Sequence, residues 1–181
     1  EDNSIENVLS GIEGSDPGVM GEGTSAIFEN ENNLGWIGGL LSIDRQDGYW
    51  IKLTGETVLN LEGLPTNPET VYSLYEGPNL ISFPDSGSVD LGSAIPDDVE
   101  DLFIAIIGEG VSAINTDNGW AGSLTGFQGG AGYWIIVQED LSFSYNTEDL
   151  LARSVHSFSE KLPDAGFTVS QSVRQAFYYV D

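Results

Sequence analysis

The chain contains the triplet Gly-Tyr-Trp twice, at residues 48–50 and again at residues 132–134. Two further landmarks precede each triplet in the same order, a Gly-Glu-Gly turn and a Gly-Trp pair. They are Gly21-Glu22-Gly23 and Gly35-Trp36 in the first copy, and Gly108-Glu109-Gly110 and Gly119-Trp120 in the second. Landmarks that recur in a fixed order indicate one structural unit written twice. The sequence therefore predicts two similar lobes.

The two copies differ slightly in length. From Gly21 to Gly108 is 87 residues, whereas from Gly35 to Gly119 is 84. The three missing residues fall in a polar stretch, residues 29–33 of the first copy and 115–118 of the second. Because loops accept length changes that strands do not, we expect this stretch to be the tip of a hairpin.

Apolar alternation and turn residues predict the same elements in both copies. In the second copy we expect a strand at 80–83, a helix at 90–103 with Ser93 as N-cap and Pro96 in its first turn, and strands at 104–107, 111–114, 120–124, 132–138 and 141–145. In the first we expect a helix at 4–9, a glycine-rich insertion, and strands at 24–28, 36–40, 49–53 and 58–61. The expected fold class is α+β: two similar lobes from an internal duplication, each a short helix plus an antiparallel β-meander.

The predicted division of the chain follows the repeat. Residues 1–62 form lobe one, residues 63–78 a proline-containing connector, and residues 79–146 lobe two. Residues 147–181 are expected to form a helix and a strand that pack back on lobe one. Lobe one has no counterpart of the opening strand at 80–83, so we expect the apolar run 175–180 to pair with one of its strands.

Composition restricts the partners. Acidic residues outnumber basic ones 29 to 5, giving a formal charge of −24. Such a charge repels phosphate backbones, so nucleic acid is excluded as a partner. No stretch of about 18 apolar residues is present, so no membrane insertion is expected. The absence of cysteine excludes disulfides, thiolate metal sites and a cysteine nucleophile.

The tryptophans Trp36, Trp50, Trp120 and Trp134 are the candidate ligand-binding residues, since aromatic platforms stack on sugars and other flat ligands. Strand alternation places Tyr49 with the core and Trp50 on the opposite face, and it separates Tyr133 from Trp134 in the same way. The neighbouring Gly-Trp strands carry a glycine on which a large ring could lie. Two interpretations therefore remain open, tryptophans packed on glycine or between lobes, and tryptophans that form a ligand platform.

No motif predicts catalysis, a cofactor or a bound metal. His156 is the only histidine, and no Gly-x-Ser-x-Gly segment supplies a nucleophile for it. The acid pairs Asp97-Asp98 and Glu100-Asp101 are explained by the positive end of a helix. The acidic loops 29–33 and 115–118 lack the alternating acids and terminal Glu of a calcium loop, so we expect calcium to be dispensable.

The order Asn-Leu-Ile-Ser-Phe-Pro at residues 79–84, then a short acidic helix, a Gly-Trp strand and Gly-Tyr-Trp, resembles tandem repeats in large secreted or surface proteins of marine bacteria. That family has no assigned chemistry, and the resemblance implies an exported, multi-module context. The expected function is a non-catalytic structural or adhesive repeat module, extracellular or on the cell surface, whose partner is a protein or polysaccharide surface. The alternative is a carbohydrate-binding module that uses exposed tryptophans. The oligomeric state is left open.

Overall fold

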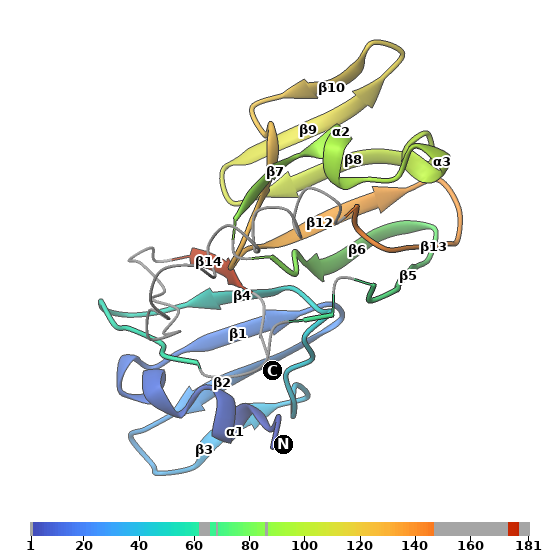
Figure 1. Cartoon of the computed structure of the whole chain (residues 1–181). Coiled ribbons are helices and arrows are strands. Elements are labelled where there is room, and N and C mark those ends of the chain that lie inside the picture. Colours follow the sequence, from blue (N-terminus) through green and yellow to red (C-terminus); the bar gives the residue numbers. More distant parts are fainter. Residues whose placement is uncertain (1, 62–65, 68, 86, 147–173, 178–181) are drawn as a thin grey trace, which may run out of the picture.

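Two five-stranded antiparallel sheets organise the chain (Figure 1). The computed structural model describes residues 2–61, 66–67, 69–85 and 87–146, and the backbone of 174–177. The first sheet has the order β14-β4-β1-β2-β3, formed by Gly18–Gly21 (β1), Thr24–Glu29 (β2), Gly35–Gly38 (β3), Tyr49–Lys52 (β4) and Arg174–Phe177 (β14). The second has the order β10-β9-β8-β12-β6, formed by Gly77–Ser82 (β6), Phe103–Gly108 (β8), Val111–Thr116 (β9), Gly119–Gly122 (β10) and Gly132–Val137 (β12).

Two small ribbons complete the strands of lobe two. One pairs Tyr72–Leu74 (β5) with Leu141–Phe143 (β13), and the other pairs Ser88–Asp90 (β7) with Gly126–Gln128 (β11). The strand β5 lies inside the stretch 63–78 that sequence analysis treated as a connector. The expected strand at 58–61 is not formed.

The expected α+β class is wrong, because the fold is mainly β. Its described helices are short: α1 (Ile5–Val8), α2 (Leu91–Ala94) and α3 (Asp97–Glu100) have four residues each, and a 3-10 helix spans Ser10–Ser15. The helix expected at 90–103 is interrupted at Pro96. Ile95 is extended, with φ −91° and ψ 130°, since the residue before a proline is sterically driven out of the helical region. Ser93 consequently lies inside α2 and caps no helix.

The repeat recurs in the strand registers. Val19 of β1 pairs with Ala26 as Ile106 of β8 pairs with Ala113, and Met20 pairs with Trp50 as Ile107 pairs with Trp134. The strand β1 was missed by sequence analysis and assigned to a glycine-rich insertion, because glycine has little intrinsic preference for strands. The extended conformation of β1 is set by its pairing with the neighbouring strands, because its own residues do not favour it.

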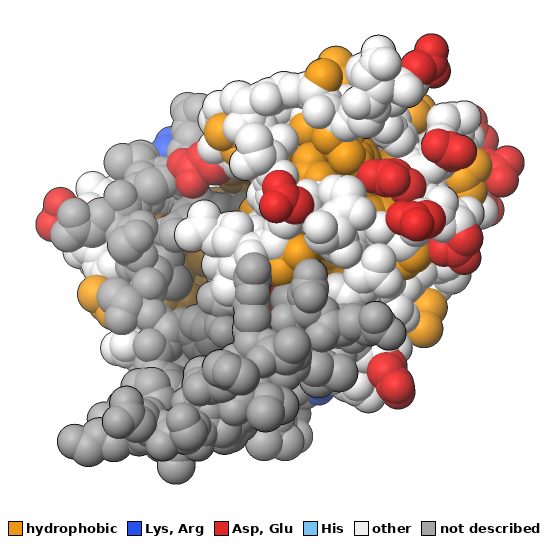
Figure 2. Space-filling view, turned by 45° about the horizontal axis from the view of Figure 1, so that its top comes forward, with side chains coloured by type: hydrophobic (Ala, Val, Ile, Leu, Met, Phe, Trp, Pro, Cys, Tyr) orange, Lys and Arg blue, Asp and Glu red, His pale blue; other side chains and the backbone are white. Residues whose placement is uncertain are grey.

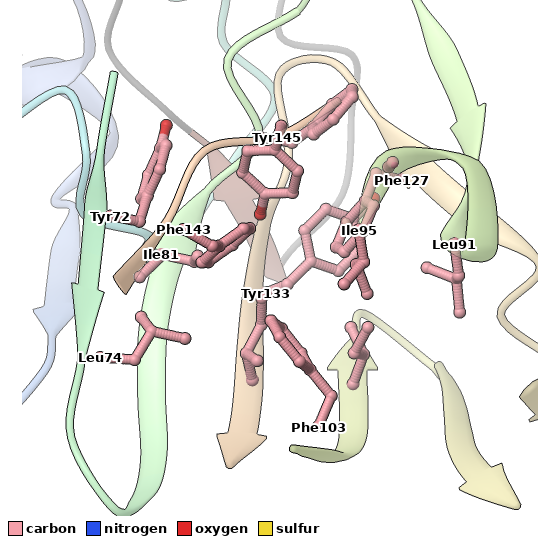
Figure 3. Packing of buried hydrophobic residues seen from close by; sticks show 14 of the residues in the cluster. Tyr72, Leu74, Ile81, Leu91, Ile95, Phe103, Phe127, Tyr133, Phe143 and Tyr145 are labelled. Atoms are coloured by element: carbon pink, nitrogen blue, oxygen red, sulfur yellow. The ribbon is translucent and has the colours of Figure 1, made fainter. Parts of the chain in front are cut away.

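Each sheet has one face on a core of its own. In lobe one the apolar side chains of α1 and the 3-10 helix cover the sheet, contributing Ile5, Val8, Leu9 and Ile12. In lobe two the cover is aromatic (Figure 3). Phe127 lies 5.0 Å from Tyr133 and 5.2 Å from Tyr145, ring centre to ring centre, in edge-to-face contacts that favour such pairs beyond their buried area.

The lobes meet along β6. One side of β6 pairs with β12, and the other is satisfied by lobe one. Gly48 donates from its backbone N to the carbonyl of Leu80 (3.0 Å), and Leu80 donates from its own N to Glu22 Oε2 (2.8 Å). This strand therefore has no open edge toward the first lobe.

The strand β14 pairs antiparallel with β4, from Arg174 opposite Lys52 to Phe177 opposite Tyr49. The expected contact between the C-terminal run and the first lobe is thus present for residues 174–177. Residues 178–180 of that run, the expected C-terminal helix and His156 lie outside the described residues.

Candidate functional site

The two Gly-Tyr-Trp triplets distribute their rings as the alternation predicts. Tyr49 and Tyr133 are buried in their cores, with exposed fractions of 1% and 4%. Trp50 and Trp134 point the other way and are partly buried. This assignment of faces is confirmed. We call the side of each sheet turned away from its core the outer face.

The tyrosines are structural. The hydroxyl of Tyr49 accepts from the backbone N of Asp44 at 2.8 Å, and that of Tyr133 accepts from Gln128 N at 2.8 Å. Burial raises the pKa of both phenols. Each ring lies against a glycine, Gly21 or Gly108, where an added Cβ would be 3.1 Å from ring atom Cε1.

The glycines of the Gly-Trp strands have a different role from the one expected. A Cβ on Gly38 would lie 2.2 Å from the backbone oxygen of Ser25, and one on Gly122 would lie 2.1 Å from that of Ser112. Backbone, and not an aromatic ring, approaches these two glycines. Glycine is therefore required at these two positions by the neighbouring backbone, and not to accommodate a tryptophan ring.

The tryptophans of the Gly-Trp pairs are held by carboxylates. Trp36 donates from Nε1 to Glu13 Oε1 at 3.3 Å, and Trp120 donates to Glu100 Oε1 at 2.7 Å. Sequence analysis missed both bonds and assigned Glu100 to the positive end of a helix. Glu13 and Glu100 stand 87 residues apart, the same separation as Gly21 and Gly108, and that agreement was the available signal. Both indole donors are consequently engaged within the fold.

Large apolar side chains are exposed on both outer faces at equivalent positions of the repeat. Met20 and Ile27 of lobe one are 53% and 57% exposed, and Ile107 and Ile114 of lobe two are 39% and 56% exposed. Met20 is the direct partner of Trp50, and Ile107 that of Trp134. Sequence analysis did not single these residues out, although the alternation along 111–114 places Ile114 on the other face of the strand from the core residue Ala113.

A groove of about 480 Å³ lies beside Trp50 on the outer face of lobe one. Met20, Ile27 and Trp50 contribute to its apolar wall, and Lys52 lies at one end. The indole Nε1 of Trp50 is buried and has no hydrogen-bond partner among the described residues. In lobe two the position of Lys52 is taken by Ile136, so the outer face there is apolar at a point where that of lobe one is charged.

Acidic side chains are spread around hydrophobic patches on the face of the molecule shown in Figure 2. Over the residues that the structure describes, no group of three or more His, Cys, Asp or Glu side chains is placed to hold a metal ion. The raised pKa of Asp47 comes from its partial desolvation and the neighbouring Asp44, and its carboxylate accepts from the Tyr49 hydroxyl at 3.2 Å. The same part of the chain contains no helix long and apolar enough to cross a membrane.

Comparisons of this chain with protein-family models, with curated proteins and with solved structures find no match. The resemblance to bacterial surface repeats therefore stays a prediction made from sequence motifs. The best-supported candidate site is the pair of apolar outer faces, centred on Trp50 with Met20 and on Trp134 with Ile107.

Proposed function

We propose that this chain is a non-catalytic structural or adhesive repeat module, extracellular or on the cell surface, that binds a protein surface through its outer faces. The observation that carries the proposal is the repetition of exposed apolar residues. Met20 and Ile27 in one sheet, and Ile107 and Ile114 in the other, occupy matching registers and are all solvent-exposed. Contiguous exposed apolar surface is typical of interaction sites.

The same surface favours a protein partner over a polysaccharide. Among the residues that line the groove, polar side chains come only from Ser25 and Lys52, whereas sugar recognition relies on several placed hydrogen-bonding groups. The indoles of Trp36 and Trp120 are already bonded to carboxylates. The alternative of a carbohydrate-binding module thus depends on Trp50 and Trp134 alone.

A bead-binding assay tests the proposal. The chain has no native cysteine, so Asn32→Cys on the exposed loop between β2 and β3 gives a single, oriented attachment point. Beads carrying the full chain are applied to surfaces coated with the full chain, with cellulose or with agarose. Every chain in this assay also carries Gln175→Pro, so that β14 of one copy cannot pair with β4 of another and mimic binding by the outer faces. Salt is kept at or above physiological strength, because the chain carries a charge of −24 and screening must shorten the repulsion.

We expect binding to the protein-coated surface that is lost in the double variant Ile27→Ser/Ile114→Ser. The matched control, Glu31→Ser/Asp117→Ser, changes exposed residues at both hairpin tips and should bind like the wild type. Retention on cellulose or agarose that requires Trp50 and Trp134 would instead support the alternative. Binding to the protein-coated surface that survives the loss of both isoleucines would refute the outer faces as the contact site.

A further inference from the structure

The neighbour of β4 comes from a distant part of the chain. In the second sheet, β12 has β6 at its side, and β6 opens the same lobe. In the first sheet the equivalent strand β4 has β14 at its side, and β14 lies more than a hundred residues further along. The strand beside β12 thus comes from the start of its own lobe, whereas the strand beside β4 comes from the far end of the chain.

The two neighbouring strands occupy the same register. Ala176 lies opposite Trp50 as Leu80 lies opposite Trp134, and the flanking pairs also correspond. Those pairs are Gln175 with Ile51 matching Asn79 with Ile135, and Phe177 with Tyr49 matching Ile81 with Tyr133. Both strands therefore present an amide residue, an aliphatic residue and a large apolar residue in that order. The edges of β4 and β12 are thus paired with the same order of residue types at equivalent positions.

The two strands differ in how firmly they are retained. The strand β6 is bonded on both sides, to β12 and to the backbone at Gln46 and Gly48. The strand β14 is a terminal strand of its sheet and four residues long, and among the described strands it pairs only with β4. An edge strand exposes a row of backbone donors and acceptors that any suitable extended segment can satisfy. Occupation of the β4 edge is accordingly a separable binding event.

We propose that the edge of β4, residues 49–52, is a strand-acceptor site whose partner is β14 of a second copy of this chain. Copies are then joined by exchanging β14, which deepens the proposed structural function by naming its partner. The exchange uses the same pairing as within one chain, so it costs little beyond the loss of intramolecular closure. The 27 residues between Asn146 and Arg174 span up to about 90 Å when extended, which is enough to reach a neighbouring copy.

Concentration decides between the two arrangements. A tethered segment of this length competes with an effective concentration on the order of 1 mM. Exchange between copies is therefore a minor state in dilute solution and becomes substantial where copies are crowded. The net charge of −24 opposes close approach, so the exchange should increase as salt screens that repulsion.

Disulfide trapping between two full-length variants tests the proposal. Lys52 and Arg174 face each other across the β4–β14 pair, and the described residues include no cysteine. A Lys52→Cys chain is mixed with an Arg174→Cys chain of different mass in a glutathione buffer. Each chain carries one thiol, so mixed disulfide in excess of the background from random collisions requires that β14 of one copy lies on β4 of the other.

At about 0.1 mM chain we expect roughly a tenth of the chains to be trapped as the mixed dimer, given an effective concentration near 1 mM for closure within one chain. Leu80, the counterpart of Ala176, turns its N–H and C=O away from β12, so the neighbouring residue Gln175 is the one whose N–H points to β4. Gln175→Pro in the Arg174→Cys chain should therefore abolish the trapping, because proline lacks that donor. A Glu31→Cys chain, with its thiol on a remote hairpin tip, gives the background. Mixed dimer no more abundant than this background, or insensitive to Gln175→Pro, would overturn the proposal.

A second measurement distinguishes failure of the strand exchange from failure of binding by the outer faces. The double variant Ile27→Ser/Ile114→Ser alters the outer faces and leaves residues 49–52 and 174–177 unchanged. The fraction of this variant trapped as the mixed dimer should equal that of the chain with unaltered outer faces, even though the variant no longer binds in the bead assay. Hydrogen exchange at Tyr49–Lys52 in the Gln175→Pro chain should be faster, and a peptide of residues 170–181 should slow it again. Failure of the peptide to protect these amides would also contradict the acceptor site.

Discussion

Replacement of Gly38 by alanine probes the closest backbone approach in lobe one. Gly38 has a φ of 150°, and a Cβ there would lie 2.2 Å from the carbonyl oxygen of Ser25 and 2.7 Å from Cα of Ala26. Gly122 in lobe two has a φ of 154° and would meet the oxygen of Ser112 at 2.1 Å. Because the obstacles are backbone atoms, no rotation of a side chain relieves them. The strands β2 and β3 must move apart.

The cost of Gly38→Ala has two parts. A side chain at this φ costs about 1–3 kcal/mol in backbone strain. Separation of the strands also weakens two bonds, because Ser25 O accepts from Gly39 N at 3.0 Å and from Leu40 N at 3.2 Å. Each such bond contributes about 0.5–1.5 kcal/mol. The free energy of unfolding should therefore fall by about 2–6 kcal/mol, a large share of the stability of an ordinary domain.

Urea unfolding followed by far-UV circular dichroism measures this change, and two other glycines separate its causes. Gly35 has a φ of 70° and open space around its Cβ position, so Gly35→Ala should cost only strain, about 1–2 kcal/mol. Gly55 also has open space around its Cβ position but no φ in the left-handed range, so Gly55→Ala should be close to neutral. Gly122→Ala and Gly119→Ala should repeat the order in lobe two. The reasoning is refuted if Gly38→Ala costs no more than Gly35→Ala.

Three further outcomes are expected. Partial desolvation and the neighbouring Asp44 raise the pKa of Asp47, so ionisation of Asp47 opposes folding. Asp47→Asn should therefore raise the melting temperature slightly at neutral pH; the rise is small because the residue is solvent-exposed. The rise should vanish as the pH falls below 3.8, the ordinary pKa of an Asp carboxyl. A rise that persists in acid would contradict this reasoning. Glu100→Ala should lower the free energy of unfolding by about 1–3 kcal/mol and Glu13→Ala by less, because the bond to Trp120 is 2.7 Å long and that to Trp36 is 3.3 Å. Equal losses in urea titrations of the two variants would contradict this order. Melting temperatures with EDTA and with millimolar calcium, at constant ionic strength, should agree within about 2 °C, whereas a calcium-specific rise would show that the acidic loops coordinate the ion.

Much of the architecture could be predicted from local pattern. The recurrence of Gly-Tyr-Trp and its flanking glycines predicted a repeated unit, and the two sheets have matching registers. Alternation along β4 and β12 placed each tyrosine in a core and each tryptophan on an outer face. These predictions succeed because the side-chain period of a strand is a property of the backbone and needs no knowledge of the partner strand.

The candidate site was only partly predictable. Trp50 and Trp134 were singled out, but Met20 and Ile107 beside them were not. Met20 lies in a strand whose glycines, Gly18 and Gly21, conceal its alternation, so the sequence shows no apolar face there. The bonds from Trp36 and Trp120 to carboxylates join residues about twenty positions apart, and no local pattern indicates such pairs.

By itself the sequence determined that one unit is repeated, where its hairpins turn, and which rings are buried, because these depend on spacing and on the residues that turns require. Only the tertiary structure decided the fold class, since Ile95 before Pro96 breaks the expected helix and the remaining turns merely cover a sheet. It also decided that β14 pairs with β4, and in which register, whereas pairing of the C-terminal run with some strand of lobe one was already expected from the missing opening strand. Strand pairing between residues so far apart is set by complementary edges in three dimensions, and the order of residues along the chain does not specify it.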